Sequence, residues 1–134
     1  MSKILIVEDD ALILRMYQEA FTSEGFEVLF ASDGQAGLEM ARANKPTIIL
    51  LDIMMPKLNG MQMLEQLKAD PAISTIPVIV LTNLSSTMDA EKALKLGAVK
   101  YVVKSEYKPR EVIKIVKDIL AGYTRGDGIP VPKV

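Results

Sequence analysis

The chain has 134 residues, with 16 lysine and arginine side chains against 17 aspartate and glutamate side chains, and contains neither cysteine nor histidine. This length suits one domain with one core, and the net charge of -1 gives no field that would draw the chain to nucleic acid or to a membrane surface. The missing residue types exclude a disulfide, a thiolate metal site and an imidazole base. The first apolar run ends at Glu8, too early for a signal sequence or a membrane span, so we expect a cytoplasmic protein.

Five short apolar segments predict β-strands, which are in chain order residues 3–7, 26–32, 47–51, 76–82 and 100–104. Three of them are nearly continuous apolar runs, as is typical of strands buried on both faces of a parallel sheet. The second strand ends in "ASDG" (residues 31–34), which we interpret as a simple turn.

Helical spacing is found in the longer segments between the strands. Residues 11–23 carry apolar side chains at this spacing, namely Leu12, Leu14, Met16, Tyr17, Ala20 and Phe21. The last segment has one apolar stripe that we expect to lie on the sheet, formed by Val112, Ile113, Val116, Ile119 and Leu120. Gly25, Gly97 and Gly122 each follow a periodic segment, where a glycine commonly ends a helix.

Five strands alternating with five helices predict an α/β fold, a doubly wound five-stranded parallel sheet with right-handed crossovers. The flavodoxin-like strand order 2-1-3-4-5 makes the first and third strands neighbours, and ligands of such sheets bind beyond the carboxyl ends of the strands. We expect residues 1–122 to form this domain and residues 123–134, which are rich in glycine and proline, to form a flexible C-terminal tail.

Polar side chains end four of the predicted strands at one edge of the sheet. Glu8 and Asp9 follow the first strand and Asp52 follows the third, so the three carboxylates should converge and repel one another unless a cation lies between them. An all-oxygen cluster suits a hard ion such as Mg²⁺. Thr82 and Lys104 end the fourth and fifth strands and would donate to phosphate oxygens. The set resembles a phosphoryl-transfer site with a carboxylate nucleophile.

Each of these residues also has a purely structural interpretation. Asp10 is well placed to cap the helix that begins at Ala11, Thr82 suits a strand, and a lysine such as Lys104 is most often solvated. Tyr101 would ordinarily be a half-buried packing residue. All of these interpretations would have to hold together at one edge of one sheet, which makes a shared site the better account.

With these residues in place, the chain resembles the receiver domains of two-component response regulators, similar to the chemotaxis regulator, over about residues 3–121. The matching motifs are "IVEDD" (6–10), "DIMMPKLNG" (52–60), "VLT" (80–82) and "YVVK" (101–104). The resemblance implies that Asp52 is the phosphoacceptor. It also implies that Asp9 binds Mg²⁺ directly, Glu8 mainly through water, and the Met54 backbone carbonyl as a further ligand.

The resemblance further implies a switch. Thr82 would hydrogen-bond the phosphoryl group and Lys104 would pair with it, while Thr82 and Tyr101 would change position together. The face formed by the fourth helix, fifth strand and fifth helix would then report the change to a partner. Pro56 and Gly60 would shape the loop around the metal.

The sequence departs from the family pattern at two positions. Ser105 follows Lys104 where the family has proline after a cis peptide; a cis bond without proline costs about 3 kcal/mol, which leaves the path of this loop open. Asn83 stands where a small residue is usual and could restrict access to the phosphoryl group. Pro109 is predicted to begin the last helix. Met54 and Leu84 are apolar, and our hypothesis is that neither positions an attacking water, which would prolong the life of the aspartyl phosphate.

The resemblance implies a signalling phosphoacceptor that catalyses only its own phosphorylation and dephosphorylation. Because the chain has no histidine, it would receive the phosphoryl group from a separate histidine kinase or histidine phosphotransfer protein. We expect a stand-alone receiver that signals to a partner protein, with no direct contact with nucleic acid or membrane. It should be monomeric, and the sequence leaves open whether phosphorylation drives dimerisation.

Three other functions are considered. A haloacid-dehalogenase-type phosphatase also uses an aspartate nucleophile and Mg²⁺ but needs a second acid two residues later, where this chain has Met54. A flavodoxin-like FMN-binding module would need a phosphate loop after the first strand, where "EDDALI" would repel phosphate. A degenerate receiver that acts only as a scaffold fits poorly with an intact set of site residues.

Overall fold

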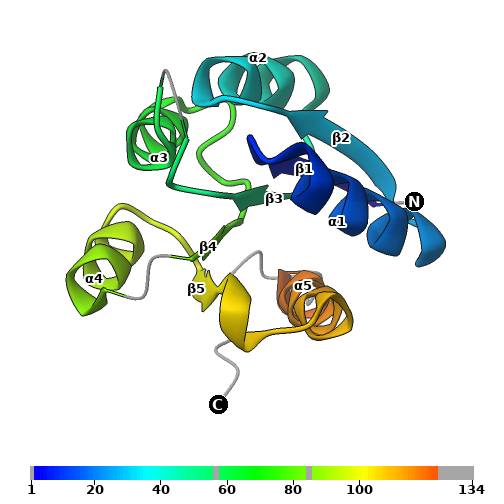
Figure 1. The fold of residues 1–134 in the computed structure, drawn as a ribbon. Coiled ribbons are helices and arrows are strands. Elements are labelled where there is room, and N and C mark those ends of the chain that lie inside the picture. The colour runs from blue at the N-terminus through cyan, green and yellow to red at the C-terminus, as the bar shows by residue number, and fades with distance from the viewer. Residues whose placement is uncertain (1, 56–57, 84–85, 124–134) are drawn as a thin grey trace.

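Five parallel strands form one sheet in the order β2-β1-β3-β4-β5, which confirms the predicted order (Figure 1). This computed structural model describes residues 2–55, 58–83 and 86–123. The strands are β1 (Lys3–Val7), β2 (Glu27–Ala31), β3 (Ile48–Leu51), β4 (Val78–Thr82) and β5 (Lys100–Val103). Each lies within a segment predicted from its apolar run.

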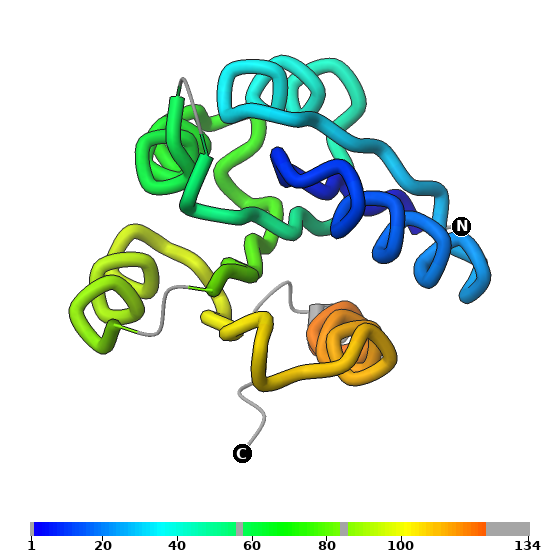
Figure 2. Tube along the Cα trace, viewed as in Figure 1, coloured from blue at the N-terminus to red at the C-terminus, as the bar shows by residue number. Residues whose placement is uncertain are grey.

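Two helices cover one face of the sheet and three cover the other (Figures 1 and 2). The helices are α1 (Ala11–Ser23), α2 (Gly34–Asn44), α3 (Gly60–Ala69), α4 (Thr87–Lys95) and α5 (Pro109–Tyr123), with a short 3₁₀ turn, η1 (Lys104–Glu106), between β5 and α5. Helices α1 and α5 pack on one face, and α2, α3 and α4 on the other. None of the helices in the described ranges is both long enough and apolar enough to cross a membrane.

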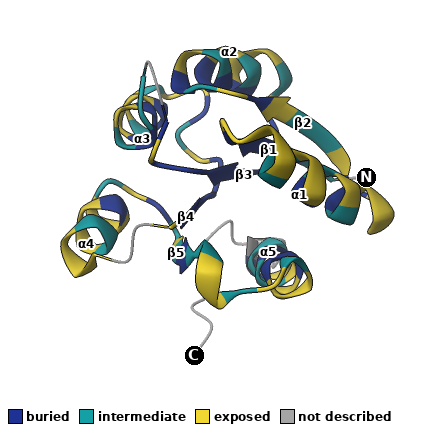
Figure 3. Cartoon of the chain, in the orientation of Figure 1, coloured by how far each residue is buried: buried dark blue, intermediate teal, exposed yellow. Residues whose placement is uncertain are grey.

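The strand residues alternate between two apolar cores, one under each helical layer. Leu5 and Val7 point into the core beneath α2, α3 and α4, whereas Ile4 and Ile6 point into the core beneath α1 and α5. All four residues of β3 are buried, as Figure 3 shows for the central strands. Full burial of a large aliphatic side chain contributes about 1.5–3 kcal/mol, so β3 is firmly anchored and fixes the residue that follows it.

Helix α1 buries less of its apolar surface than its sequence suggests. Tyr17 and Phe21 are buried, and the Phe21 ring meets the Phe26 ring edge to face at 5.1 Å between centroids. In contrast, Leu12 is 80% exposed and Met16 is 43% exposed. The helical spacing therefore predicted the helix correctly but overstated the width of its buried face.

Most of the predicted helix ends are confirmed. The Asp10 carboxylate accepts hydrogen bonds from the backbone N–H groups of Leu12 and Ile13 and caps α1, and α5 begins at Pro109. Gly25 and Gly97 follow α1 and α4 with φ of 89° and 111°, values that favour glycine.

The prediction that Gly122 ends a helix is wrong. Gly122 is buried within α5, which continues to Tyr123. A glycine inside a helix costs only about 1 kcal/mol relative to alanine, which the packing of the buried α5 stripe can offset. Residues 124–134 lie outside the described residues, and the flexible tail stays a prediction.

Candidate functional site

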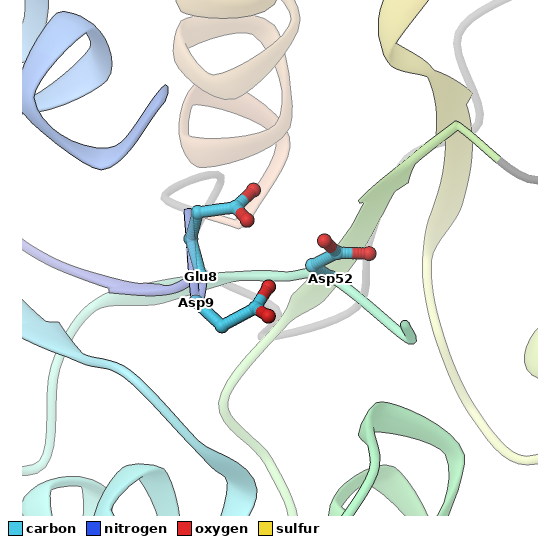
Figure 4. Close-up of side chains that lie close together, drawn as sticks. All are labelled: Glu8, Asp9 and Asp52. Atoms are coloured by element: carbon cyan, nitrogen blue, oxygen red, sulfur yellow. The ribbon is translucent and has the colours of Figure 1, made fainter. Parts of the chain in front are cut away.

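The sheet register brings the carboxylates of β1 and β3 together. Val7 pairs with Leu51, and the Asp52 N–H donates to the Val7 carbonyl at 3.0 Å. Glu8 and Asp9 therefore follow β1 beside the point where Asp52 follows β3. One carboxylate oxygen from each of Glu8, Asp9 and Asp52 lies within 4.8 Å of the other two. Figure 4 shows the three side chains gathered at this edge.

Two of the three acids are sheltered from solvent and one is open to it. Glu8 is 4% exposed and Asp52 is 7% exposed, whereas Asp9 is exposed. A backbone N–H group fixes each sheltered carboxylate: Asp10 donates to Glu8 Oε2 at 3.0 Å, and Met54 donates to Asp52 Oδ1 at 3.0 Å. The cluster thus combines two rigid buried oxygens with an acid that solvent can reach.

Lys104, the first residue after β5, bridges the two sheltered acids. Its Nζ donates to Asp52 Oδ2 at 3.1 Å and to Glu8 Oε1. The Lys104 side chain is only 9% exposed, so all three charged groups are largely removed from water. Such buried charges are costly unless they are paired. One ammonium group beside three carboxylates still leaves the cluster negative, which favours an additional cation.

Burial and pairing shift the pKa values of this pair in a consistent way. Burial raises the pKa of Glu8 above its ordinary value, although the hydrogen bond from Lys104 acts in the opposite direction. Burial alone would lower the pKa of Lys104, but its hydrogen bond to Glu8 and the charge of Asp52 outweigh burial and raise it. Lys104 is therefore a permanent ammonium group at neutral pH.

Thr82 and Tyr101 lie on the adjacent strands β4 and β5. Thr82 ends β4, is fully buried and pairs with Val103 in the register of the two strands. Tyr101 is half-buried and packs against the core beneath α2, α3 and α4. Burial raises the pKa of Tyr101, and the charges of Asp89 and Asp52 add to the effect.

Ser105 and Asn83, the two residues that depart from the family pattern, lie beside Lys104 and Thr82 in the structure. Lys104, Ser105 and Glu106 form η1, and no cis peptide bond is found in the described part of the chain. Asn83 is exposed and lines a cavity of about 170 Å³ together with Lys104 and Tyr17. Tyr17 is 3% exposed, and its sequence position on a helix suggested only packing. Leu84 and Pro56 lie outside the described residues.

The sequence interpretation missed the role of the segment "ASDG". Instead of forming a simple turn, it starts α2: the Asp33 carboxylate accepts from the Ala36 N–H at 2.8 Å as the helix cap. The Gly34 N–H donates to the Leu58 carbonyl at 3.0 Å, across to the loop that follows Asp52. An aspartate followed by a glycine ahead of a periodic segment is a helix-start signal, but its long-range partner is not visible in the sequence.

The described residues fit a hard divalent cation. The ligand atoms that this cluster offers are carboxylate oxygens, which Mg²⁺ prefers. Mg²⁺ usually binds to one or two carboxylates and keeps several waters. The exposed carboxylate of Asp9 leaves room for those waters. The net negative charge of the cluster would be reduced by the ion.

Comparison with known proteins identifies the class to which this fold and site belong. The family model described as the response regulator receiver domain matches residues 4–117. The chain belongs to this family, the receiver domains of two-component response regulators.

Similar proteins with curated descriptions are longer than this chain. It is 38% identical over 118 residues to the alkaline phosphatase synthesis transcriptional regulatory protein PhoP of Bacillus subtilis, an alignment that covers 88% of this chain and 48% of that protein. It is 37% identical to the probable transcriptional regulator ycf27 of Porphyra purpurea, covering 88% and 47% of the two chains. The chain therefore spans about half the length of the curated relatives it matches.

Solved structures agree with the fold over nearly all of the chain. A putative response regulator from Chloroflexus aurantiacus superposes with a TM-score of 0.83 at 28% identity, covering 90% of this chain and 98% of that chain. The signal receiver domain of a signal transduction histidine kinase from Syntrophus aciditrophicus superposes with a TM-score of 0.84 at 28% identity, covering 99% and 100%.

Proposed function

We propose that this receiver accepts a phosphoryl group on Asp52 with the help of Mg²⁺ and passes the signal to a partner protein through the surface formed by α4, β5 and α5. The observation that supports this most directly is the position of Asp52. Its carboxylate accepts a hydrogen bond from the Lys104 ammonium group and lies close to the acids that follow β1, at the carboxyl edge of a buried sheet.

The chemistry needs a donor from another molecule, since the chain contains no histidine. A partner histidine kinase or histidine phosphotransfer protein would present a phosphohistidine. One Asp52 oxygen attacks phosphorus, the phosphorus–nitrogen bond breaks, and the donor imidazole leaves with the electron pair of that bond. The product is an aspartyl phosphate, which the same site would later hydrolyse.

Different residues of this chain would stabilise the transferred phosphoryl group in different ways. Glu8, Asp9 and Asp52, together with the Met54 carbonyl, would hold Mg²⁺, which neutralises negative charge on the phosphoryl oxygens when it is bound. Lys104 is already fixed between two carboxylates and would pair with a phosphoryl oxygen. The Thr82 hydroxyl would donate to another.

A switch would follow from the new charge. Thr82 and Tyr101 lie on adjacent strands near Asp52, so a dianionic group there would favour one joint arrangement of these two side chains. On α4, Met88 is 80% exposed and Leu94 is 48% exposed, which offers apolar surface for a protein target. We propose no direct contact between this receiver and nucleic acid, because its net charge of -1 gives no field that would draw it to a polyanion.

The proposal is tested with acetyl phosphate as a small phosphodonor. Intact-mass measurement should show one added phosphoryl group on the wild type when Mg²⁺ is present and none after chelation. Asp52→Asn should remain unmodified, and Asp9→Asn should be modified much more slowly.

Asp10→Asn is the matched control, because Asp10 is the neighbouring acid but serves as the α1 cap. It should be modified at nearly the wild-type rate. A phosphoryl group retained by Asp52→Asn under the same conditions would contradict the assignment of the acceptor.

A further inference from the structure

We propose that Gly34, the first residue of α2, is a positioning residue for the metal site, because its missing side chain lets α2 hold the loop that follows Asp52 in place. The inference rests on the proposed Mg²⁺ function of that site. It concerns a residue that carries no charge and contacts none of the proposed ligands. Its effect would pass through Leu58 and Gly60 to the Asp52 backbone.

The inner side of the loop packs directly on the phosphoacceptor segment. A β-carbon placed on Gly60 would lie 2.3 Å from the Ile53 Cα and 2.4 Å from the Asp52 carbonyl oxygen. The Gly60 N–H also donates to the Ile53 carbonyl at 3.3 Å. The start of α3 is therefore in backbone contact with Asp52. A movement of this segment would displace the Asp52 backbone and with it the carboxylate.

The outer side of the same loop rests on α2. The Gly34 N–H donates to the Leu58 carbonyl at 3.0 Å, and a β-carbon on Gly34 would lie 2.1 Å from that carbonyl oxygen and 2.9 Å from its carbon. Figure 2 shows the start of α2 (cyan) beside the chain that enters α3 (green). The segment Leu58–Gly60 is thus held between the Asp52 backbone and the first residue of α2.

The α2 side of this contact cannot move easily. Gly34 is fixed by the Asp33 cap, and α2 is anchored by Leu38 and Ala41, which are 1% and 0% exposed. The atom opposite Gly34 is a backbone oxygen rather than the end of a flexible side chain. A methyl group at residue 34 would therefore push the Leu58 carbonyl by a distance on the order of 1 Å. Residues that orient metal ligands typically change metal affinity by about 10- to 100-fold when they are altered.

The experiment compares Gly34→Ala with Gly37→Ala. Gly37 lies one turn later in α2, where an added β-carbon would meet the end of the buried Met63 side chain at 2.8 Å and a methyl group of Val7 at 3.1 Å, and no backbone atom of the loop. Both variants crowd the inner side of α2, but only Gly34→Ala meets the backbone of the loop. Isothermal titration with MgCl₂, with the folded fraction determined by circular dichroism, gives the Mg²⁺ affinity of the folded protein.

We expect Gly34→Ala to bind Mg²⁺ about tenfold more weakly than the wild type, and Gly37→Ala to bind it within about twofold. Equal affinities for Gly34→Ala and the wild type would overturn the inference. So would an equal loss in both variants, since crowding of the helices would then explain it. Binding of Mg²⁺ by the wild type tests the proposed function itself, so the two failures are distinguishable.

If Gly34→Ala does not fold, the wild type decides the question. Coupling between two sites is reciprocal. If the hydrogen bond from Gly34 to Leu58 increases the affinity for Mg²⁺, bound Mg²⁺ must stabilise that hydrogen bond. Hydrogen exchange of the Gly34 amide should become slower when Mg²⁺ is added, whereas the Gly37 amide, which donates to Asp33 within the helix, should change less. An unchanged Gly34 exchange rate in Mg²⁺-saturated protein would refute the role.

Discussion

Replacement of Lys104 by methionine should make the stability of the protein depend on Mg²⁺. Lys104 pairs with both Glu8 and Asp52, and all three side chains are less than one-tenth exposed. Removal of one partner from a buried ion pair leaves an uncompensated charge, which typically costs about 3–5 kcal/mol. Methionine keeps the aliphatic stem, so the loss should come from the charge.

The structure sets an upper limit on this cost. Instead of remaining charged and unpaired, the Glu8 carboxyl can take up a proton, and its ordinary pKa is 4.5. Protonation at pH 7 costs about 3.4 kcal/mol, since each pH unit corresponds to about 1.36 kcal/mol. We therefore expect Lys104→Met to lower the free energy of unfolding by about 3 kcal/mol at pH 7 without metal.

The pH dependence has a definite sign. In the variant, folded Glu8 would bind a proton that unfolded Glu8 releases above pH 4.5. The folded state then holds more protons, so its stability falls as the pH rises from 4.5 to 7, by up to about 1.36 kcal/mol per unit. The deficit relative to the wild type should accordingly shrink in mildly acidic buffer.

Urea unfolding of both proteins, with chelator and with saturating Mg²⁺, measures these effects. Mg²⁺ replaces the missing positive charge, so it should stabilise the variant more than the wild type. Lys117→Met is the matched control, because Lys117 pairs with Glu24 at 2.5 Å on an exposed surface and should lose no more than about 1 kcal/mol. A Lys104→Met protein as stable as the wild type in chelator would refute the reasoning.

Three further predictions concern single side chains. Hydrogen bonds from the Ala72 backbone N–H and then from Arg42 lower the pKa of Asp70. In urea unfolding, the wild type should therefore be more stable than Asp70→Asn above pH 3.8, and this difference should disappear as the pH falls through the folded pKa of Asp70. Asp52→Asn removes one charge that raises the pKa of Tyr101, so that pKa, followed by NMR titration, should move down towards 10.0; an unchanged value would contradict the coupling. Met54 is 53% exposed, and Met54→Asn should speed loss of the phosphoryl group in a decay assay if an apolar side chain there fails to position water; an unchanged decay rate would count against this.

Much of the fold could be predicted because the decisive signals are local. The continuous apolar runs of β3 and β4 indicate strands buried on both faces, and the stripe on α5 indicates a helix with one buried face. What the sequence does not show is how much of a face is covered. Leu14 lies two turns before Phe21 on the same stripe of α1, yet it is only half-buried while Phe21 is fully buried.

The convergence of Glu8, Asp9 and Asp52 was predictable for a related reason. In a parallel sheet the carboxyl ends of all strands share one edge, so acids after β1 and β3 had to meet once the strand order was right. The double contact of Lys104 with Glu8 and Asp52 could not be predicted, because it depends on the local path of η1. The contact between Gly34 and Leu58 was equally hidden, since neither residue carries a functional group that signals a partner.

The sequence separations within the site connect its chemistry to the stability of the whole domain. Lys104 lies 96 residues from Glu8 and 52 from Asp52 along the chain. Its ammonium group reaches both only if β1, β3, β4 and β5 are paired in the observed register, because a shift of one residue in any strand would turn its side chains to the other face. A ligand at this edge therefore binds the folded sheet and not the unfolded chain. By linkage it must stabilise the entire domain, so Mg²⁺ bound here would act on every element that the sheet holds together.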